Sequence, residues 1–236
     1  MLNAELQPSA LPHPTLAATG RKPPQAARPQ QLYLTPGQTI GVEAEPAALL
    51  YRVTQGCIAL YHMLDDGRRQ IIDILGPERC FRAADPAMTA RALTYTKVDV
   101  IDPAAAPQLS ADSAIKALAR IHRHAMLLGR MTAAEKVASA LLDLAGQFPR
   151  KSRGGRPGKP SLTLYLTRAD LADWLGLTIE TVSRTLNQFK RDGLIDFTHA
   201  EVVTISRPDA LGTLASGGTV TPTRPARRTR EAVQPA

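Results

Sequence analysis

Residues 166–190 carry the sequence feature that most constrains how this chain can fold. In the run LTRADLADWLGLTIETVSRTLNQFK, Thr167 can cap the start of one helix, with Asp170 three residues later. Gly176 can end that helix, because glycine accepts the left-handed conformation of a helix C-cap. Thr178 can cap a second helix, whose apolar residues recur at helical spacing: Val182, Leu186 and Phe189. Two helices joined by a short turn with glycine predict a helix-turn-helix, a motif whose second helix enters the major groove of DNA.

The polar face of the second helix is the predicted DNA-reading surface. Glu180, Arg184 and Asn187 are spaced i, i+4 and i+7, which places them on one side of a helix. Arginine can donate two hydrogen bonds to guanine O6 and N7, and a carboxylate can accept one from cytosine N4. A glutamate four residues before an arginine is also a common salt bridge on a solvated helix. The helix-turn-helix context, in a chain of net charge +8, favours the DNA-reading interpretation.

A family resemblance rests on these same residues. The run GLTIETVSRTL, followed by FKRDGLI, resembles the DNA-binding domain of the Crp–Fnr superfamily of bacterial transcription regulators. The E-T-V-S-R form is similar to the Fnr and FixK branches rather than to the cyclic-AMP receptor branch, and the resemblance covers residues 131–216. It implies that Glu180, Ser183 and Arg184 read bases in a palindromic site of the TTGAT-N4-ATCAA kind.

Further DNA contacts are expected around these base-reading residues. The polar and basic residues concerned are Thr178, Thr181, Asn187, Lys190 and Arg191. Lysine and arginine contacts of this kind hold phosphates, which position a protein on DNA without specifying the sequence. The basic, glycine-rich segment at residues 151–159 is a further candidate for phosphate contact.

The first half of the chain has the pattern of short strands and turns. Asp65 to Arg68 can close a hairpin between strands at 57–64 and 69–75, because Asp-Gly favours a tight turn. A further strand is predicted at Leu49–Gln55. The run YRVTQGCIALYHMLDDGRRQIIDIL resembles the β-roll of the sensor domain in the same superfamily.

After Leu75 the chain departs from that family pattern. A phosphate-binding cassette would need backbone donors from glycines together with an arginine. Arg79, Arg82 and Arg91 could each bind an anion, but scattered arginines of this kind are usually solvated. The chain is expected to run almost directly to a last strand at Ala92–Ile101. We therefore predict a shortened roll and no cofactor.

A long helix is predicted at Ser110–Met131. Its apolar residues alternate in steps of four and three, which is the seam of a coiled coil: Ala114, Leu118, Ile121, Ala125 and Leu128. The alternative is a helix packed on its own sheet. In the resembling superfamily the equivalent helix forms the dimer interface, and a two-fold dimer would match a palindromic DNA site. We therefore expect a homodimer.

These elements predict an α+β chain with five segments. Residues 1–30 are a disordered leader rich in proline, alanine and glutamine, and 217–236 are a disordered basic tail. Between them lie a truncated, cyclic-nucleotide-binding-like β-roll at 31–109 and a dimerisation helix at 110–131. A winged helix-turn-helix domain, with its wing hairpin after the second helix, follows at 132–216.

Composition narrows the classes of function. A net charge of +8 and a pI near 9.9 suit a polyanionic partner such as double-stranded DNA. The sequence has no apolar run long enough to span a bilayer and no signal peptide, so we expect a cytoplasmic protein with no membrane partner. It also lacks a nucleophile elbow, a metal-ligand cluster and a nucleotide loop. We expect a transcription regulator and not an enzyme. The resemblance implies an activator with RNA polymerase as a partner, since activation is the commoner outcome in that superfamily.

The two cysteines, Cys57 and Cys80, leave one alternative open. They are too few for a four-thiolate iron–sulfur cluster. They could nevertheless make the protein a redox-gated regulator, or the first domain could gate DNA binding through a small molecule. The opposing interpretation is that both cysteines are ordinary small buried residues.

Overall fold

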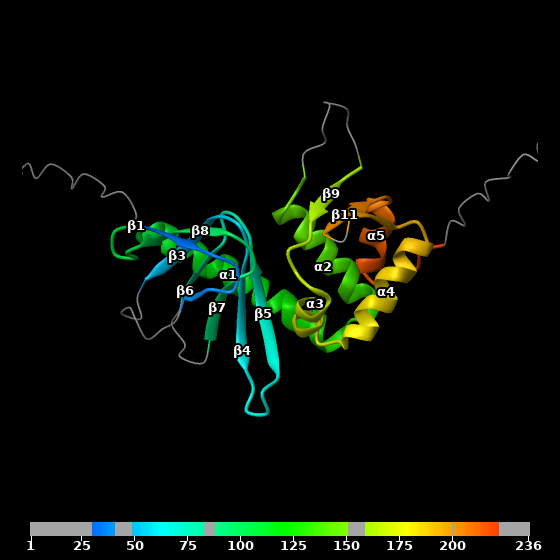
Figure 1. The fold of residues 1–236 in the computed structure, drawn as a ribbon, viewed down its shortest axis with the longest axis horizontal. Helices are drawn as coiled ribbons and strands as arrows, with labels where there is room; N and C mark the ends of the chain where they lie inside the picture. The colour runs from blue at the N-terminus through cyan, green and yellow to red at the C-terminus, as the bar shows by residue number, and fades with distance from the viewer. Residues whose placement is uncertain (1–29, 41–48, 83–87, 151–158, 200, 222–236) are drawn as a thin grey trace, which may run out of the picture.

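The computed structural model describes residues 30–40, 49–82, 88–150, 159–199 and 201–221. They form an N-terminal β-roll and a C-terminal domain of helices and short strands, which a long helix, α1 (Pro107–Arg130), connects (Figure 1). The predicted leader lies outside the described residues except for Gln30, which begins the first strand. The predicted tail lies outside them from residue 222 onward, whereas Val220 packs against the core of the C-terminal domain.

The roll is built from two antiparallel four-stranded sheets. The first has the order β1 (Gln30–Leu34), β8 (Thr96–Ile101), β3 (Leu50–Gln55) and β6 (Cys80–Arg82). The second has the order β2 (Thr39–Ile40), β7 (Met88–Ala92), β4 (Ile58–Met63) and β5 (Arg69–Leu75). Alternate side chains of the two sheets meet in a shared apolar core, as the period of two in a strand requires. Its members include Tyr51, Val53, Ile58, Leu75, Phe81 and Val98.

The hairpin between β4 and β5 forms where the Asp-Gly pair predicts it. The backbone N–H of Leu64 donates to the carbonyl of Arg68 over 2.8 Å, and that of Gly67 donates to Leu64 over 2.9 Å. Gly67 has a φ of 82°, a left-handed conformation that glycine adopts at little cost. Asp66 accepts from the backbone N–H of Arg68 over 3.0 Å and so closes the turn with its side chain.

The expectation for the segment after Leu75 is wrong in its strands. Two short strands, β6 and β7, lie between β5 and β8, and Ala92 ends β7 instead of starting the last strand. β6 is only three residues long and pairs with β3, while β7 pairs with β4 and β2. Such short strands are stabilised by partners distant in the sequence, so their local pattern is weak. The segment between β5 and β8 is short, but strands of both sheets still contribute side chains to the common core.

The long helix α1 (Pro107–Arg130) begins three residues before the predicted start at Ser110. Pro107 occupies its first turn, where a fixed φ suits the helix and a missing N–H costs nothing. The following helix, α2 (Ala133–Gln147), begins with the predicted capping box. Thr132 accepts from the backbone N–H of Glu135 over 3.4 Å, and Glu135 accepts from that of Thr132 over 2.9 Å.

One face of α1 is apolar and exposed. Of its 24 residues only Ser113 and Leu127 are buried. Large apolar side chains stand out from the helix with half or more of their surface exposed: Ile115 at 68%, Leu118 at 54%, Ile121 at 50% and Met126 at 64%. Leu118 and Ile121 belong to the predicted seam. Both also border a pocket against Leu50 and Phe81 of the roll, so the helix lies along the roll while much of these two side chains stays exposed.

The C-terminal domain combines helices with a three-stranded sheet of order β10-β11-β9. Its further elements are β9 (Ser161–Thr163), α3 (Arg168–Leu175), α4 (Ile179–Arg191), β10 (Ile195–His199), β11 (Val202–Ile205) and α5 (Pro208–Ala215). The β10–β11 hairpin is the predicted wing, although β10 extends to His199, where a turn was expected. One buried cluster contains Leu171, Leu186 and also Ile71 and Ile74 of the roll. Packing therefore fixes the C-terminal domain against the roll.

Candidate nucleic-acid interface

The helix-turn-helix forms from the local signals that predict it. Thr167 and Asp170 make a reciprocal capping box at the start of α3, with bonds of 3.0 Å in both directions. Gly176 ends α3 in the left-handed conformation, with φ 59° and ψ 47°. Thr178 then caps α4 by accepting from the backbone N–H of Thr181 over 3.2 Å. These caps give both helices defined ends and a tight turn between them.

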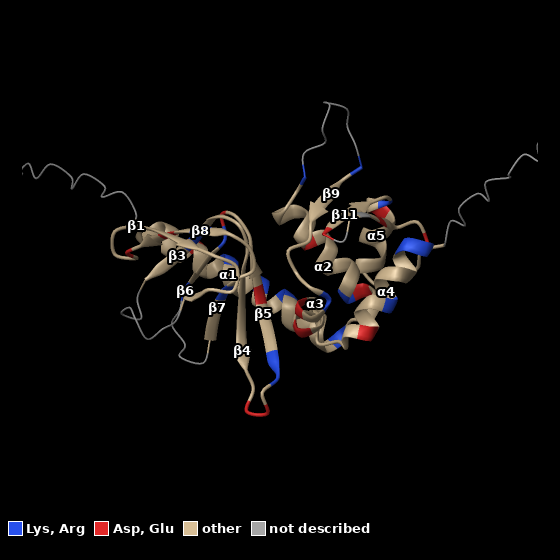
Figure 2. Cartoon of the chain, viewed as in Figure 1, with Lys and Arg blue, Asp and Glu red and all other residues tan. Residues whose placement is uncertain are grey.

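The second helix, α4, is amphipathic. Val182, Leu186 and Phe189 are buried at 0%, 1% and 3% exposure and hold the helix on the core. The opposite face is solvent-exposed and carries Glu180, Arg184 and Asn187, the three residues predicted at i, i+4 and i+7. Figure 2 shows where charged residues fall along α4. The structure therefore brings these three side chains to one accessible side of the helix.

The two charged side chains on this face, Glu180 and Arg184, remain available to a partner. Glu180 and Arg184 are joined by no ion pair, and the guanidinium makes one long hydrogen bond, from Nη2 to Thr181 Oγ1 over 3.4 Å. The pKa of Glu180 lies below its usual range because the carboxylate bonds its own backbone N–H and the Thr178 side chain, with Arg184 adding a weaker attraction. A charged carboxylate and a guanidinium with free donors suit the edges of cytosine and guanine.

The other predicted contact residues differ in their exposure and in the bonds they already make within the protein. Thr178 and Thr181 take part in the cap of α4, while Asn187 is exposed and Ser183 is half-buried beside it. At the end of α4, Arg191 bonds Gln188. Lys190 lies 3.6 Å from Asp196 of β10. The basic segment at residues 151–158 lies outside the described residues, and Lys159 after it is exposed.

Two aromatic contacts join the wing to the helices. Phe197 of β10 lies under two cations, with Arg168 of α3 at 5.1 Å and Lys190 of α4 at 6.0 Å from its ring centroid. Cation–π contacts of this kind hold a cation beside a ring without removing its charge. The wing thereby positions a positive charge near the end of α4. Sequence reasoning missed Arg168 and Phe197, because their contact depends on how the hairpin folds back.

A second missed group links the helix-turn-helix to the roll. Arg69 of β5 donates to Asp170 over 2.7 Å and to Asp173 over 2.6 and 2.9 Å, and Gln70 Nε2 donates to the carbonyl of Asp173 over 2.7 Å. We call Arg69, Asp170 and Asp173 the roll latch. Its partners lie about a hundred residues apart in the sequence, so only the paired carboxylates on one face of α3 could have indicated it.

Asp170 serves both the latch and the helix cap. Burial would raise its pKa, but the hydrogen bonds from the side chain and backbone of Thr167 and from Arg69 outweigh that effect, so the pKa lies below its usual range. The carboxylate is therefore charged at neutral pH. It stabilises the start of α3 and its attachment to the roll at the same time.

The two cysteines are buried in the roll. Cys57 has no exposed surface and Cys80 is 6% exposed. Burial raises the pKa of Cys57 far above its usual range, which keeps the thiol protonated. Within the described ranges, no group of three or more potential ligands is placed to bind a metal, and no helix is long and apolar enough to cross a membrane.

A β-roll, a long connecting helix and a helix-turn-helix with an exposed polar helix define a class of DNA-binding transcription regulators. Two family models match this arrangement, a Crp-like helix-turn-helix domain over residues 135–214 and a cyclic nucleotide-binding domain over residues 31–113. Together they match most of the described roll and nearly all of the C-terminal domain. The chain belongs to the Crp–Fnr family of transcription regulators, within its Fnr and FixK branch.

The relatives agree with this placement. The chain is 32% identical to the nitrogen fixation regulation protein FixK of Rhizobium meliloti, over 77% of this chain and 85% of that protein. It is 31% identical to the transcriptional activator protein FnrL of Cereibacter sphaeroides, over 67% and 69% of the two chains. The structure of FixK2 from Bradyrhizobium japonicum superposes with a TM-score of 0.68, at 29% identity, over 82% of this chain and 98% of that one. These relatives are regulators rather than enzymes.

Proposed function

We propose that two copies of this chain bind a palindromic DNA site of the TTGAT-N4-ATCAA kind. The α4 helix of each copy enters one major groove, and Glu180, Ser183 and Arg184 contact base edges there. The observation that carries this proposal is the exposed face of α4, on which a charged carboxylate and a guanidinium remain unpaired with each other. Arg184 would donate to a guanine and Glu180 would accept from a cytosine.

Phosphate contacts would surround these base contacts. Lys190 and Arg191 lie at the end of α4 with their charges in solvent, and Thr178 and Thr181 lie at its start, where backbone N–H groups favour an anion. Asn187 lies one turn beyond Arg184 on the same face. These contacts hold the helix in register and add affinity that depends on salt but not on sequence.

The exposed apolar face of α1 supports dimerisation. Leu118 and Ile121 of the predicted seam are half exposed, and Ile115 and Met126 lie near them. Burying large apolar side chains between two parallel copies of a helix removes them from water. A two-fold dimer presents two α4 helices related by symmetry, which is the arrangement that a palindrome requires.

The proposed outcome of binding is activation of transcription through contact with RNA polymerase. Support comes from the relatives, since FnrL is described as a transcriptional activator protein and AadR of Rhodopseudomonas palustris, 33% identical over 70% of this chain, as a transcriptional activatory protein. The FixK relatives are described as regulators of nitrogen fixation.

Fluorescence anisotropy with labelled duplexes tests the proposal. The purified full chain is titrated into a TTGAT-N4-ATCAA duplex and into a duplex in which both half-site guanines are changed, at one salt concentration. Specific recognition predicts a preference of tenfold or more for the first duplex, since each mismatched base pair costs about 1–3 kcal/mol. Equal, salt-sensitive affinity for both would show that charge alone drives binding and would overturn the assignment.

The burial of the thiols argues against redox gating as a second function. Cys57 is fully buried and its raised pKa leaves no thiolate to react. We expect peroxide to leave DNA affinity unchanged in the protein with both cysteines intact. A peroxide-dependent loss of affinity that disappears in a Cys57→Ala, Cys80→Ala variant would restore the redox alternative. Gating by a small molecule is a separate matter and depends on whether the protein has a cavity for one.

A further inference from the structure

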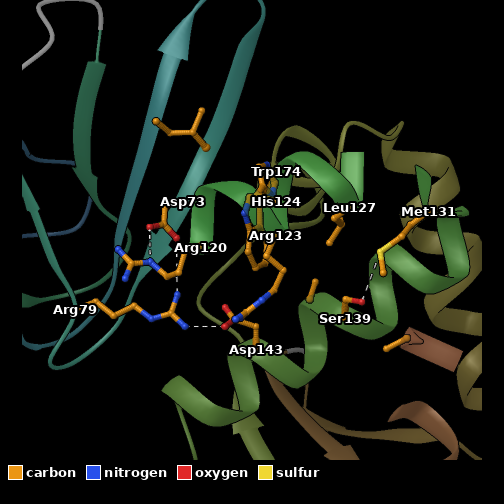
Figure 3. Close-up of a pocket in the computed structure, with 13 residues that line it drawn as sticks. Asp73, Arg79, Arg120, Arg123, His124, Leu127, Met131, Ser139, Asp143 and Trp174 are labelled. Carbon is orange, nitrogen blue, oxygen red and sulfur yellow. Dashed lines mark hydrogen bonds and ion pairs between the residues drawn. The ribbon is translucent and has the colours of Figure 1, made fainter. Parts of the chain in front are cut away.

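A cavity of about 240 Å³ lies where the roll, α1 and the C-terminal domain meet. Five elements form its walls. They contribute Asp73 (β5), Arg120 and Arg123 (α1), Ser139 and Asp143 (α2), Trp174 (α3) and Ala215 (α5) (Figure 3). At about 30 Å³ per water molecule, this space corresponds to roughly eight waters, or a ligand of similar heavy-atom count. We call it the junction cavity.

The charges on the cavity wall do not balance. Arg120 Nε donates to Asp73 over 2.8 Å, and Arg79 Nη2 donates to Asp143 over 2.6 Å. Arg79 Nη1 also lies 3.7 Å from Asp73, so the two carboxylates are paired with Arg79 and Arg120. Arg123, one turn beyond Arg120 on α1, forms no hydrogen bond or ion pair with any described residue, although Figure 3 shows its side chain extending toward Asp143. Three guanidinium groups therefore face two carboxylates.

Two buried groups leave this surplus in place. Burial lowers the pKa of His124, so its imidazole is neutral at neutral pH and adds no charge. Burial also raises the pKa of Asp73, against the attraction of Arg120 and Arg79, and protonation there would only increase the positive surplus. The cavity consequently lacks one negative charge.

The remaining wall is apolar and offers one free hydroxyl. Ile72, Leu127, Met131, Ala140 and Ala215 line it, together with the ring of Trp174, which stacks on His124 at 6.1 Å between centroids. Ser139 Oγ has only the sulfur of Met131 as a partner, at 3.9 Å, and a thioether is a weak acceptor. Arginine and serine donors beside an apolar wall match a carboxylate carried on a compact apolar body.

We propose that the junction cavity binds a small monocarboxylate with an apolar body. The guanidinium of Arg123 and the hydroxyl of Ser139 hold the carboxylate, and the apolar wall holds the rest of the ligand. Because the walls belong to both the roll and the C-terminal domain, an occupant stabilises their present arrangement. This inference does not rest on the proposed palindromic site, and it is tested without DNA.

The chain provides its own reporter, because Trp174 is the one tryptophan in the sequence and it lines the cavity. Cyclohexanecarboxylate, which has nine heavy atoms and does not absorb at the excitation wavelength of tryptophan, is titrated into the full-length protein. We expect a saturable change in tryptophan fluorescence with a dissociation constant of millimolar or below. Cyclohexanecarboxamide, the uncharged analogue, should bind at least tenfold more weakly.

Three variants separate this site from general anion binding. Arg123→Gln should weaken cyclohexanecarboxylate at least tenfold, since it removes an unpaired charge without breaking any contact. Ser139→Ala should weaken it about threefold. Lys116→Gln, which removes an exposed charge from the same helix away from the cavity, should leave it unchanged. Absence of any saturable signal, equal binding of the amide, or equal effects of the Arg123 and Lys116 variants would each overturn the proposal.

Discussion

The helices α1 and α4 both present an uncovered face to solvent, but the chemistry of the two faces is opposite. The outer face of α1 is apolar, with Ile115 and Leu118 more than half exposed. The outer face of α4 is polar and charged, with Glu180 and Arg184 at its start. When an apolar helix face packs against a similar face, its removal from water lowers the free energy. An exposed polar face instead binds a partner whose donors and acceptors match its own.

This contrast assigns different roles to the two helices, association of the chains to α1 and choice of DNA sequence to α4. The α1 face would bring two chains together without regard to DNA sequence, and the α4 face would then distinguish one sequence from another. The roll latch and the shared core join the roll to the domain that carries α4. If the contrast is correct, changes on α1 should alter the number of chains bound, and changes on α4 should alter the choice of sequence.

The largest effect is expected from breaking the apolar face of α1. A Leu118→Glu, Ile121→Glu double variant places two like charges at the seam, so the chain should sediment as a monomer. Affinity for the palindromic duplex should fall about 100-fold or more, because the second half-site then gains no effective concentration from the first. Analytical ultracentrifugation and anisotropy measure the two outcomes.

Lys116→Glu is the matched control for the α1 variant. Lys116 is exposed on the same helix but outside the seam. This substitution should leave the chain dimeric. If the double variant also remains dimeric, the apolar face of α1 is not the interface between copies.

Removing the guanidinium on α4 should change sequence preference. The Arg184 side chain is exposed, so Arg184→Ala leaves the core of the domain intact and we expect normal folding. It should cost about 1–3 kcal/mol on the TTGAT-N4-ATCAA duplex and much less on the duplex with changed guanines. Equal losses on both duplexes would mean that Arg184 contacts a phosphate rather than a base.

The roll latch should contribute a smaller, pH-dependent stability. Asp170→Asn removes a charge that bonds both Thr167 and Arg69, at a cost of about 1–2 kcal/mol in the free energy of unfolding at pH 7. Because the folded-state pKa of Asp170 is lowered, its contribution is present above the unfolded pKa and is lost as pH falls through the folded value. The difference from the unmodified protein should therefore shrink below about pH 4.

Asp173→Asn sharpens that measurement. Asp173 shares Arg69 with Asp170 but takes no part in the cap of α3. Urea unfolding at several pH values should show a smaller loss for this variant than for Asp170→Asn. Equal losses would assign the whole effect to the latch and none to the helix cap.

The smallest effect is expected at Arg191. The guanidinium at the end of α4 is exposed and is predicted to contact a phosphate. Arg191→Ala should weaken binding to both duplexes by a similar factor of a few, and it should reduce the slope of log affinity against log salt by about 1. A selective loss on the TTGAT-N4-ATCAA duplex would instead place Arg191 among the base contacts.

Local signals explain how much of this molecule can be predicted from its sequence. The capping residues Thr132, Thr167 and Thr178 and the left-handed Gly176 act within a few residues, and the structure confirms them. The strands β6 and β7 were missed because distant pairing partners stabilise them. The family and the presence of the roll could be predicted, but the number of strands in it could not.

The same distinction applies to the site. The exposed side of α4 follows from helical periodicity, so Glu180, Arg184 and Asn187 could be placed on it in advance. Arg69, Arg168 and Phe197 reach their partners only through tertiary folding. The junction cavity arises where several elements meet, and no stretch of sequence encodes it alone.

The spacing between half-sites tests the central claim most directly. Two rigidly connected copies can contact both half-sites only at one separation and rotation along the helix axis. Anisotropy should therefore show that TTGAT-N4-ATCAA binds at least tenfold more tightly than the same half-sites separated by six base pairs, at equal salt. Equal affinity for the two spacings would show that the copies bind independently, and it would contradict the account of a dimer that reads a palindrome.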